Sequence, residues 1–250
     1  MGFGRFDWSR IGPPYRPTRE VIAQFAEICD VTEPTLLLGV TPEFYDSFPH
    51  LTGVEKEKQI IDSVWPGDEQ DRSAIHEDWR EMDHARYSYG NIIGDLAVTL
   101  LGNQYVIKKF HHRCMDWLKP EGIYLQRVML RRSRVTASDL LEDDGLGWHA
   151  FKMKMKHHIA WHTDGPVRWE WILDLFNDTF PDRDALASSR GWTRPQVDTI
   201  DFYEGSDVVT CVLTEEQWRY ICPDAARVEF IQTEGYEYAE HCPLLMWEKR

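Results

Sequence analysis

Residues 34–43, with the sequence PTLLLGVTPE, constrain the fold more than any other stretch of the chain. An apolar run bounded by turn residues is typical of a buried strand, and Gly39 ends it where the missing Cβ lets a ligand approach the backbone. Three later segments are also short strands that end in a polar or acidic residue: 51–55 (LTGVE), 74–79 (AIHEDW) and 91–95 (NIIGD). In an open α/β sheet, ligands bind beyond the carboxyl ends of the strands. The pattern therefore predicts a nucleotide-type site at that edge.

Helical segments alternate with these strands. Apolar residues recur at helical spacing in three segments: 18–29, with Thr18 as N-cap, 56–64 and 104–117. A fifth strand, 123–130, follows a turn at 119–122. Strands that alternate with helices at this spacing predict a parallel, doubly wound, Rossmann-like sheet.

After residue 131 this alternation stops. The predicted elements are a helical stretch broken by glycines (137–161), an amphipathic helix (167–180), a loop (190–195), a β-rich run (197–213) and a short helix (215–222). Two last strands, 227–233 and 244–247, then complete a seven-stranded, mostly parallel sheet. We therefore expect an α/β fold with a cap segment inserted between strands five and six.

The predicted organisation has four parts. An N-terminal arm and helix (1–30) precede the nucleotide-binding core (31–130), the inserted cap (131–213) follows, and the last helix with the closing strands (214–250) returns to the core. A chain of 250 residues has enough material for a core and a cap. The arm carries aromatic residues among glycines and prolines, which favours an arm held to the surface by its rings over one that covers a ligand.

The net charge argues against nucleic acid as a partner. Lys and Arg total 28 against 42 Asp and Glu, a formal charge of −14, and no basic run could follow a phosphate backbone. No apolar stretch reaches the roughly 18 residues that a membrane helix needs, and the N-terminus has no signal-peptide or transit-peptide pattern. Five scattered cysteines without a Cys-x-x-Cys pair are typical of reduced thiols in a cytoplasm. The oligomeric state stays open, with a homodimer as one option.

The strand ends favour a ligand with an adenosine part and no phosphates, because the chain has no Gly-x-Gly-x-x-Gly and no P-loop lysine. Glu55 could accept both hydroxyls of a ribose. Asp78 could accept the exocyclic amine of adenine while Trp79 packs on the ring face, and Asp95 would lie near the reactive end. Two simpler interpretations stay open. Gly39 could form an ordinary tight turn, and Glu55 could be a solvated acid in a charged run.

Taken in order, these motifs resemble the class I S-adenosylmethionine-dependent methyltransferases, and they look closest to a bacterial small-molecule-type subgroup. The resemblance runs over residues 35–130, and the closing strands extend it to the C-terminus. It rests on LLLGVTPE, the acidic end of the second strand, VWPG, DW, IGD, and LKPEG before the fifth strand. It implies S-adenosyl-L-methionine as the cofactor and methyl transfer to an oxygen or nitrogen of a small-molecule acceptor, with a biosynthetic pathway as one setting.

The resemblance also implies which residues bind the cofactor. It places the methionine part at Gly39 and Thr41, the ribose at Glu55, the adenine at Asp78 and Trp79, and the sulfonium at Asp95 and Leu96. The family's Gly-x-Gly-x-Gly loop is replaced here by Gly39-Val40-Thr41-Pro42, so one glycine carries the close approach.

Methyl transfer needs a general base only if the acceptor is protonated at the working pH. The candidate catalytic residues are Asp95, His149 and Tyr203. Further histidines that could serve are His111, His112, His157, His158 and His162. The last three could suggest a metal, but the acidic or cysteine ligands are lacking, so we expect a solvated helix end and no metal.

The cap sequence carries lysines and tryptophans whose role is ambiguous. Lys152, Lys154 and Lys156 alternate with methionines, which predicts a half-exposed helix surface. The tryptophans favour packing within the cap, with an aromatic substrate pocket as the alternative: Trp148, Trp161, Trp169 and Trp171.

Two other functions stay open at this point. The same cofactor could react at another sulfonium carbon, by displacement or cyclisation. The chain could also be a non-catalytic binding subunit with a degenerate core, which Phe44 or Tyr45 would indicate if either side chain blocked the cofactor cleft.

Overall fold

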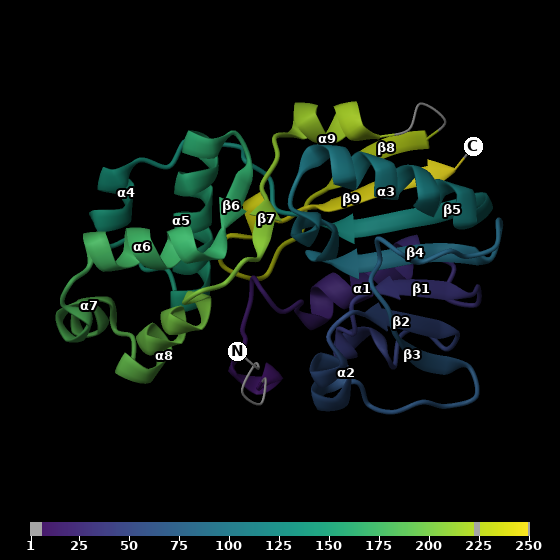
Figure 1. Cartoon of the computed structure of the whole chain (residues 1–250), viewed down its shortest axis with the longest axis horizontal. Helices are drawn as coiled ribbons and strands as arrows, with labels where there is room; N and C mark the ends of the chain where they lie inside the picture. The colour runs from purple at the N-terminus through teal and green to yellow at the C-terminus, as the bar shows by residue number, and fades with distance from the viewer. Residues whose placement is uncertain (1–6, 223–225, 250) are drawn as a thin grey trace.

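A seven-stranded sheet forms the centre of the protein (Figure 1). The computed structural model describes residues 7–222 and 226–249, and its sheet has the order β3-β2-β1-β4-β5-β9-β8. The strands are β1 (Thr35–Leu38), β2 (Leu51–Glu55), β3 (Arg72–His76), β4 (Tyr89–Asp95), β5 (Leu118–Arg127), β8 (Ala226–Ile231) and β9 (Leu244–Lys249). The first five are parallel, and β9 is antiparallel to both β5 and β8. The predicted Rossmann-like, mostly parallel sheet is confirmed.

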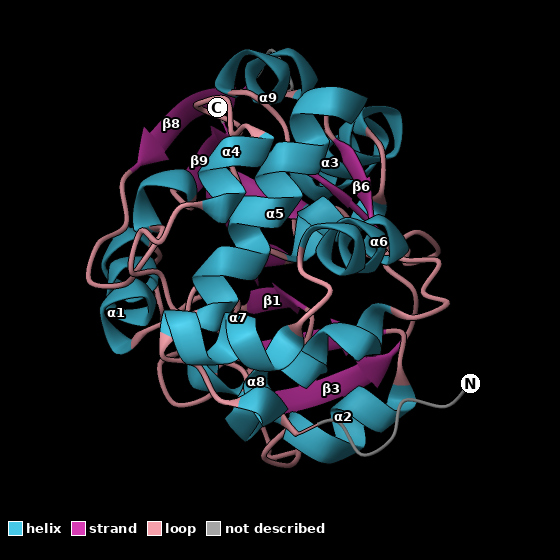
Figure 2. Cartoon of the chain, turned by 90° about the vertical axis from the view of Figure 1, so that its left-hand side faces the viewer, coloured by secondary structure: helices cyan, strands magenta, loops and turns pink. Residues whose placement is uncertain are grey.

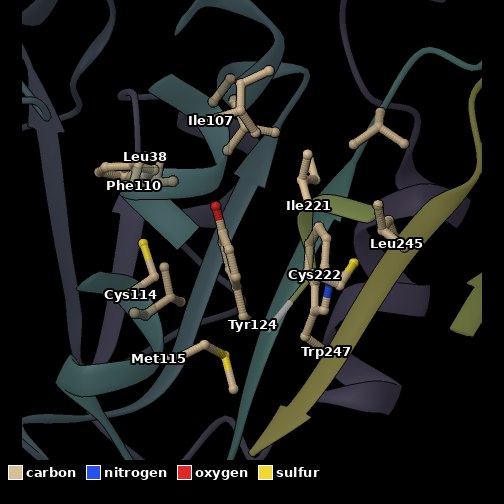
Figure 3. Close-up of a cluster of buried hydrophobic side chains, with 14 of the residues drawn as sticks. Leu38, Ile107, Phe110, Cys114, Met115, Tyr124, Ile221, Cys222, Leu245 and Trp247 are labelled. Carbon is tan, nitrogen blue, oxygen red and sulfur yellow. Dashed lines mark hydrogen bonds between the residues drawn. The ribbon is translucent and has the colours of Figure 1, made fainter. Parts of the chain in front are cut away.

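Side chains that alternate along the strands fill two apolar layers. Leu36 and Leu38 of β1 belong to the layer under α3 (Gln104–Trp117) and α9 (Glu215–Ile221). Leu37 belongs to the layer under α1 (Arg19–Ile28). Figure 3 shows part of the first layer, in which the rings of Tyr124 and Trp247 stack with centroids 4.8 Å apart. All four side chains of β1 are buried because both faces of the strand are covered.

Polar caps set where the main helices begin. Thr18, Asn103 and Thr214 each accept a hydrogen bond from a backbone N–H in the first turn of α1, α3 and α9, respectively. The predicted cap at Thr18 is thus present. The short helix α2 (Lys58–Val64) follows β2 almost directly and contacts β2 and β3.

A helical segment lies beyond the carboxyl ends of the parallel strands (Figure 1), and Figure 2 shows it in front of the sheet. Its helices are α4 (Ala137–Leu141), α5 (Trp148–Thr163), α6 (Trp169–Thr179), α7 (Arg183–Arg190) and α8 (Arg194–Asp198). A small antiparallel pair, β6 (Pro166–Arg168) and β7 (Val209–Cys211), joins it to the rest. Any ligand at the strand ends would therefore lie between the sheet and these helices.

The β-rich run predicted at 197–213 is wrong for most of its length. It begins in α8, continues through the 3₁₀ helix η4 (Thr199–Tyr203), and contains only β7 as a strand. Thr193 and Gln196 form a capping box that starts α8 within the predicted loop, at residue 194, and the helix continues past the end of that loop. The apolar residues Val197, Ile200 and Tyr203 are three apart and all buried, which is a helical rather than a strand pattern.

The turn predicted at 119–122 lies inside β5. Tyr89 of β4 pairs with Leu118, and Asn91 pairs with Ile123, so the extra residues of β5 bulge out of the ladder between these two pairs. The strand therefore begins earlier than the sequence pattern predicts.

All five cysteines are buried and free of disulfides. Over residues 7–222 and 226–249, the helices are too short or too polar to cross a lipid bilayer.

His111 of α3 is enclosed by aromatic rings. Its ring centroid lies 4.8 Å from that of Tyr124 and 4.4 Å from that of Trp247, and neither ring nitrogen has a hydrogen-bond partner in the part of the chain that the structure describes. Burial lowers the pKa of His111 to about 3, so the imidazole stays neutral in the folded protein.

Stability should therefore fall in acid, and His111→Phe should reduce that fall. In the unfolded chain this histidine binds a proton at the ordinary pKa of 6.5, whereas in the folded protein it binds one only near a pKa of about 3. Between these values, each such histidine lowers the free energy of unfolding by up to about 1.4 kcal/mol per pH unit. Urea unfolding from pH 7.5 to pH 4 should give the variant a slope that is shallower by about this amount. Equal slopes would contradict the assignment.

Candidate functional site

The carboxyl ends of the parallel strands are in register. Leu38 pairs with Val54 on one side and with Gly94 on the other, and Val54 pairs in turn with Ile75. The residues that follow these positions therefore lie along one edge of the sheet. This edge carries the predicted cofactor-binding residues: Gly39, Thr41, Glu55, Asp78, Trp79, Asp95 and Leu96.

Gly39 turns the chain at the end of β1. Its φ is +90°, which side chains rarely tolerate, and its N–H donates to the carbonyl of Val54 at 2.9 Å. A Cβ built on Gly39 would meet only Trp79, at 4.0 Å. The indole N–H of Trp79 also donates to the Val54 carbonyl, at 2.6 Å, which fixes the ring beside the glycine. Thr41, half-buried, begins the short turn η2 (Pro42–Phe44) without a side-chain cap.

Phe44 and Tyr45 do not close this corner. The Phe44 ring packs against Phe25 of α1, with centroids 4.9 Å apart, on the far face of the sheet. The Tyr45 hydroxyl donates to the carbonyl of Gly67 at 2.8 Å, and its ring lies against Trp65. The side chains that would have indicated a blocked cleft are thus held elsewhere.

Glu55 and Asp78 carry carboxylates with different partners. Glu55 is half-buried at the end of β2, its Oε1 accepts the Glu57 N–H at 3.0 Å, and burial raises its pKa. Asp78 accepts from the Arg80 Nε with both oxygens, at 3.0 and 3.1 Å, and this contact lowers the pKa of Asp78. A carboxylate has about four lone-pair sites, so each can still accept from a ligand.

Asp95 is locked in a buried ion pair. Its two oxygens accept from Nε and Nη2 of Arg127, at 2.5 and 2.9 Å, and both side chains are shielded from solvent. Burial disfavours the charged Arg127, but the Asp95 carboxylate together with Tyr236 and Cys242 outweighs burial, so the pKa of the guanidinium is raised. The next residue, Leu96, has φ +56° and donates its N–H to the Arg127 carbonyl at 2.9 Å. Left-handed backbone at a leucine is costly and clusters at functional sites.

The N-terminal arm crosses this edge and binds it at several points. Trp8 donates its indole N–H to Glu43 at 2.9 Å, and Arg16 pairs with the same carboxylate. The carbonyl of Pro14 accepts from Arg127 at 2.7 Å. The arm is therefore held over the carboxyl edge. This position favours the interpretation in which its aromatic residues cover a ligand.

The structure brings the predicted catalytic residues His149 and Tyr203 to one cluster around Tyr15 of the arm. The rings of His149 and Tyr15 have centroids 6.2 Å apart, and His149 Nε2 contacts the carbonyl of Arg10 at 3.1 Å. Burial lowers the pKa of His149 to about 4 and raises the pKa of Tyr203 to about 12. Both are neutral at pH 7, and His149 is a weaker base than an ordinary histidine.

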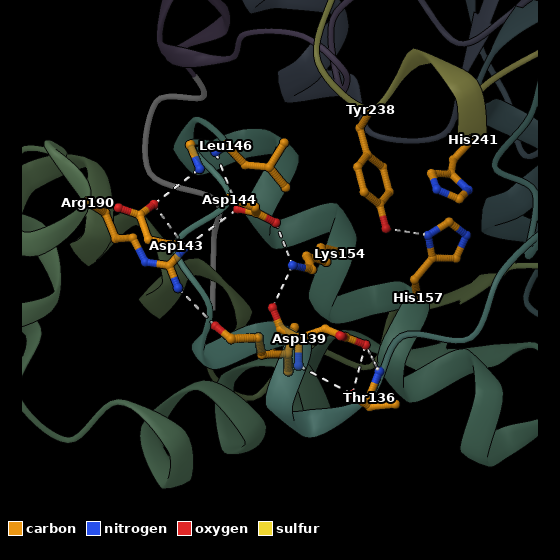
Figure 4. A network of polar contacts seen from close by, with 12 residues as sticks. Thr136, Asp139, Asp143, Asp144, Leu146, Lys154, His157, Arg190, Tyr238 and His241 are labelled. Atoms are coloured by element: carbon orange, nitrogen blue, oxygen red, sulfur yellow. Dashed lines mark hydrogen bonds and ion pairs between the residues drawn. The ribbon is translucent and has the colours of Figure 1, made fainter.

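The half-exposed surface predicted for the lysines of α5 is wrong for two of them. Lys152 and Lys156 are buried, whereas Lys154 is half-buried and pairs with Asp144 at 2.5 Å (Figure 4). The sequence reasoning did not predict the burial of Lys152 and Lys156. The signal for it was the four-residue spacing that puts Trp148, Lys152 and Lys156 on one helix face.

The histidines at 157, 158 and 162 do not form a metal site. His157 is buried, against the predicted solvated helix end, and its Nδ1 contacts the Tyr238 hydroxyl at 2.7 Å (Figure 4). Nδ1 of His158 contacts the Val135 carbonyl at 2.9 Å. No group of three His, Cys, Asp or Glu side chains that could hold a metal ion occurs within residues 7–222 and 226–249.

Comparison with solved structures finds proteins with a similar fold. An S-adenosylmethionine-dependent methyltransferase from Mesorhizobium loti matches 93% of this chain and 98% of its own, with 11% identity and a TM-score of 0.56. The N-methyltransferase NodS from Bradyrhizobium japonicum WM9, in complex with S-adenosyl-L-homocysteine, matches 97% and 91%, with 12% identity and a TM-score of 0.51. A Rhodobacter sphaeroides protein provisionally described as a zinc-dependent alcohol dehydrogenase matches 97% of both chains, with 10% identity and a TM-score of 0.60.

No protein-family model matches the sequence, and the comparison with curated proteins finds no match. At 10–12% identity, the structural likeness concerns the fold alone. The chain has the fold of class I S-adenosylmethionine-dependent methyltransferases, over nearly its whole length.

Arg127→Met should destabilise the protein by about 3–5 kcal/mol, because it leaves the Asp95 carboxyl group buried without its partner. Arg80→Met is the matched control. It removes the exposed pair with Asp78 and should cost at most about 1 kcal/mol. Urea unfolding at pH 7 measures both. The double variant Asp95→Leu/Arg127→Met should recover part of the loss, and a loss no larger than that of the control would refute the burial cost of the pair.

Proposed function

We propose that the chain is an S-adenosylmethionine-dependent methyltransferase that acts on a small-molecule acceptor. The observation that carries the proposal is the single edge of the sheet at which Gly39, Glu55 and Asp78 lie at or just beyond the ends of three neighbouring strands in register. On a fold shared with S-adenosylmethionine-dependent methyltransferases, this is the edge where an adenosyl ligand would bind.

The residues at the edge suit the cofactor in the predicted order. The methionine part would approach the backbone at Thr41 and at Gly39, where an added Cβ would meet only Trp79. The ribose hydroxyls would donate to Glu55. The adenine would lie against Trp79 and donate its amine to Asp78. A ligand without phosphates fits this edge because the side chains of the edge offer carboxylates rather than cations.

The sulfonium end would lie at Leu96, beside the Asp95–Arg127 pair. When bound, S-adenosylmethionine supplies an electrophilic methyl group: its bond to sulfur breaks as the acceptor's oxygen or nitrogen forms a new one, and the electron pair stays on sulfur. The chain aligns the acceptor with that bond. Asp95 has both oxygens on Arg127, so its role is to hold the edge in place, and the acceptor's proton would go to His149 or to water. Tyr203 stays protonated at pH 7 and could only donate a hydrogen bond to the acceptor.

The proposed substrate cap is the segment 131–213, which together with the arm would enclose an acceptor of small size. The acidic net charge favours such an acceptor over nucleic acid, and we keep a cytoplasmic location, a biosynthetic role and a homodimer as parts of the proposal. Product analysis separates the competing chemistry. S-adenosylhomocysteine indicates methyl transfer, whereas methylthioadenosine indicates attack at another sulfonium carbon.

Gly39→Ala should weaken the binding of S-adenosylhomocysteine by about tenfold or more, since about 1.4 kcal/mol corresponds to a factor of ten. The added Cβ would enter the space that the ligand approaches. Isothermal titration calorimetry measures the dissociation constant. No binding of S-adenosylmethionine or S-adenosylhomocysteine by the wild type would refute the proposal.

Gly191→Ala is the matched control for backbone strain. Gly191 ends α7 with φ +66°, and a Cβ there would meet nothing within 4 Å. Both variants should lose about 1 kcal/mol of stability from the left-handed backbone. Only Gly39→Ala should bind S-adenosylhomocysteine more weakly. An equal loss of affinity in both variants would show that Gly39 is not part of the binding site.

A further inference from the structure

Two buried lysines on one face of α5 lack a counter-charge among residues 7–222 and 226–249. Lys152 and Lys156, called the lysine pair below, expose 8% and 3% of their surface. Neither forms an ion pair or a hydrogen bond with any residue in these ranges. Buried lysines are almost always paired, so this arrangement is unusual.

The ammonium groups face aromatic rings instead. Those of the lysine pair lie 5.4 and 4.5 Å from the ring centroid of Tyr15, respectively. Within the described residues, the rings within 6 Å of one or both ammonium groups are those of Tyr15, Trp148, Trp169 and Tyr203. Cation–π attraction recovers only part of the hydration that burial removes, and the two like charges one helical turn apart repel each other.

The electrostatics of the pair are therefore incomplete in the protein alone. Burial lowers the pKa of Lys152 to about 8, and burial together with the charge of Lys152 lowers the pKa of Lys156 to about 7. An anion between the two groups would favour their charged forms and reverse both shifts.

The lysine pair lies next to the edge at which the cofactor would react. Tyr15, which contacts both lysines, follows Pro14, whose carbonyl binds Arg127 of the Asp95 ion pair. Leu96, the residue assigned to the sulfonium end, packs against the same apolar cluster as Tyr15 and Trp169. A molecule bound by the lysines would thus lie on the helical side of the proposed methyl donor.

We propose that Lys152 and Lys156 bind the carboxylate of the methyl acceptor, whose flat, apolar body lies among the rings of Tyr15, Trp169 and Tyr203. The proposal rests on the proposed function, because it names the class of acceptor for that same site: a small aromatic carboxylic acid. A monoanion suits the pair, whose total charge near pH 7 is between one and two. The rings offer flat apolar surface to the remainder of such a molecule.

The first experiment compares acids with their neutral amides on the full chain saturated with S-adenosylhomocysteine. The panel is benzoate, phenylacetate, 4-hydroxybenzoate and anthranilate, each with its primary amide, and phenyl phosphate. By isothermal titration calorimetry, at least one carboxylate should bind about tenfold or more tightly than its amide. If no carboxylate exceeds its amide, or if phenyl phosphate binds more tightly than every carboxylate, the proposal is wrong.

Proton uptake gives a second test on the wild type. At pH 8 a carboxylate ligand is fully ionised, so protons taken up on binding must come to the protein. Burial raises the pKa of both Tyr203 and Cys242 to about 12, raises that of Tyr15, and lowers that of His149 to about 4. None of these groups around the lysine pair changes its charge near pH 8. Titrations in two buffers of different ionisation enthalpy should show uptake, and binding without uptake would contradict the proposal.

Variants place the effect on the lysines. Lys152→Met and Lys156→Met keep most of the side-chain length and remove the charge, so both variants should have a higher Tm at pH 7 and should lose the preference for acid over amide. Lys109→Met, at an exposed position of α3, is the control, and it should keep the wild-type Tm and the wild-type preference for acid over amide. An unchanged preference in Lys152→Met and Lys156→Met would overturn the proposal, and if either variant fails to fold, the two wild-type tests decide.

The outcomes also separate this inference from the proposed function. If S-adenosylhomocysteine binds but no acid is preferred over its amide, the function stands and the lysine site fails. If acids bind through the lysines but neither S-adenosylmethionine nor S-adenosylhomocysteine binds, the site stands as an anion site and the methyltransferase proposal fails.

Discussion

The buried ion pair between Asp95 and Arg127 organises the carboxyl edge of the sheet. Removing two charges from water costs several kcal/mol each, and the pair is tolerated because Arg127 satisfies both oxygens of Asp95 and also donates to Pro14. Three segments distant in sequence thereby meet: the end of β4, the end of β5 and the N-terminal arm. Leu96 takes its left-handed conformation directly after this pair, and Tyr15 is placed against α5 directly after Pro14.

Charge is separated across the edge. The sheet side offers the carboxylates of Glu55 and Asp78, and the helical side offers the two buried ammonium groups of Lys152 and Lys156. The hydroxyls and the amine of the adenosyl part would face the carboxylates, and an anionic acceptor would face the ammonium groups. This arrangement also keeps an acceptor's carboxylate away from the acids of the cofactor side, since like charges in a low-dielectric environment repel strongly. The Asp95–Arg127 pair, neutral as a unit, lies between the two sides.

Sequence reasoning succeeded where local pattern and tertiary structure agree. The run LLLGV predicts β1 because both faces of that strand are buried, and the acidic strand ends predict the edge because parallel strands end together. It failed where distant segments decide the environment. Residues 148–163 lie among α4, α6 and the arm, so almost every face of α5 is buried and two of its lysines, Lys152 and Lys156, are buried with it. Asp95 pairs with Arg127, which lies 32 residues further along the chain in an apolar strand. Only the fold shows that these two side chains meet.

The glycines show how a ligand site differs from tight packing. A Cβ on Gly94 would lie 2.3 Å from Gln126, and one on Gly90 would lie 2.3 Å from Glu33, so neighbouring side chains explain both glycines. Gly39 has no such reason, because its nearest atom to a built Cβ is 4.0 Å away, on Trp79. Its positive φ accounts for a residue without a side chain, but not for the open space in front of it. Gly39 lies at the end of β1 beside an indole whose N–H is already bonded, so under the proposed function a phosphate-free ligand would approach the backbone there without displacing a packed side chain.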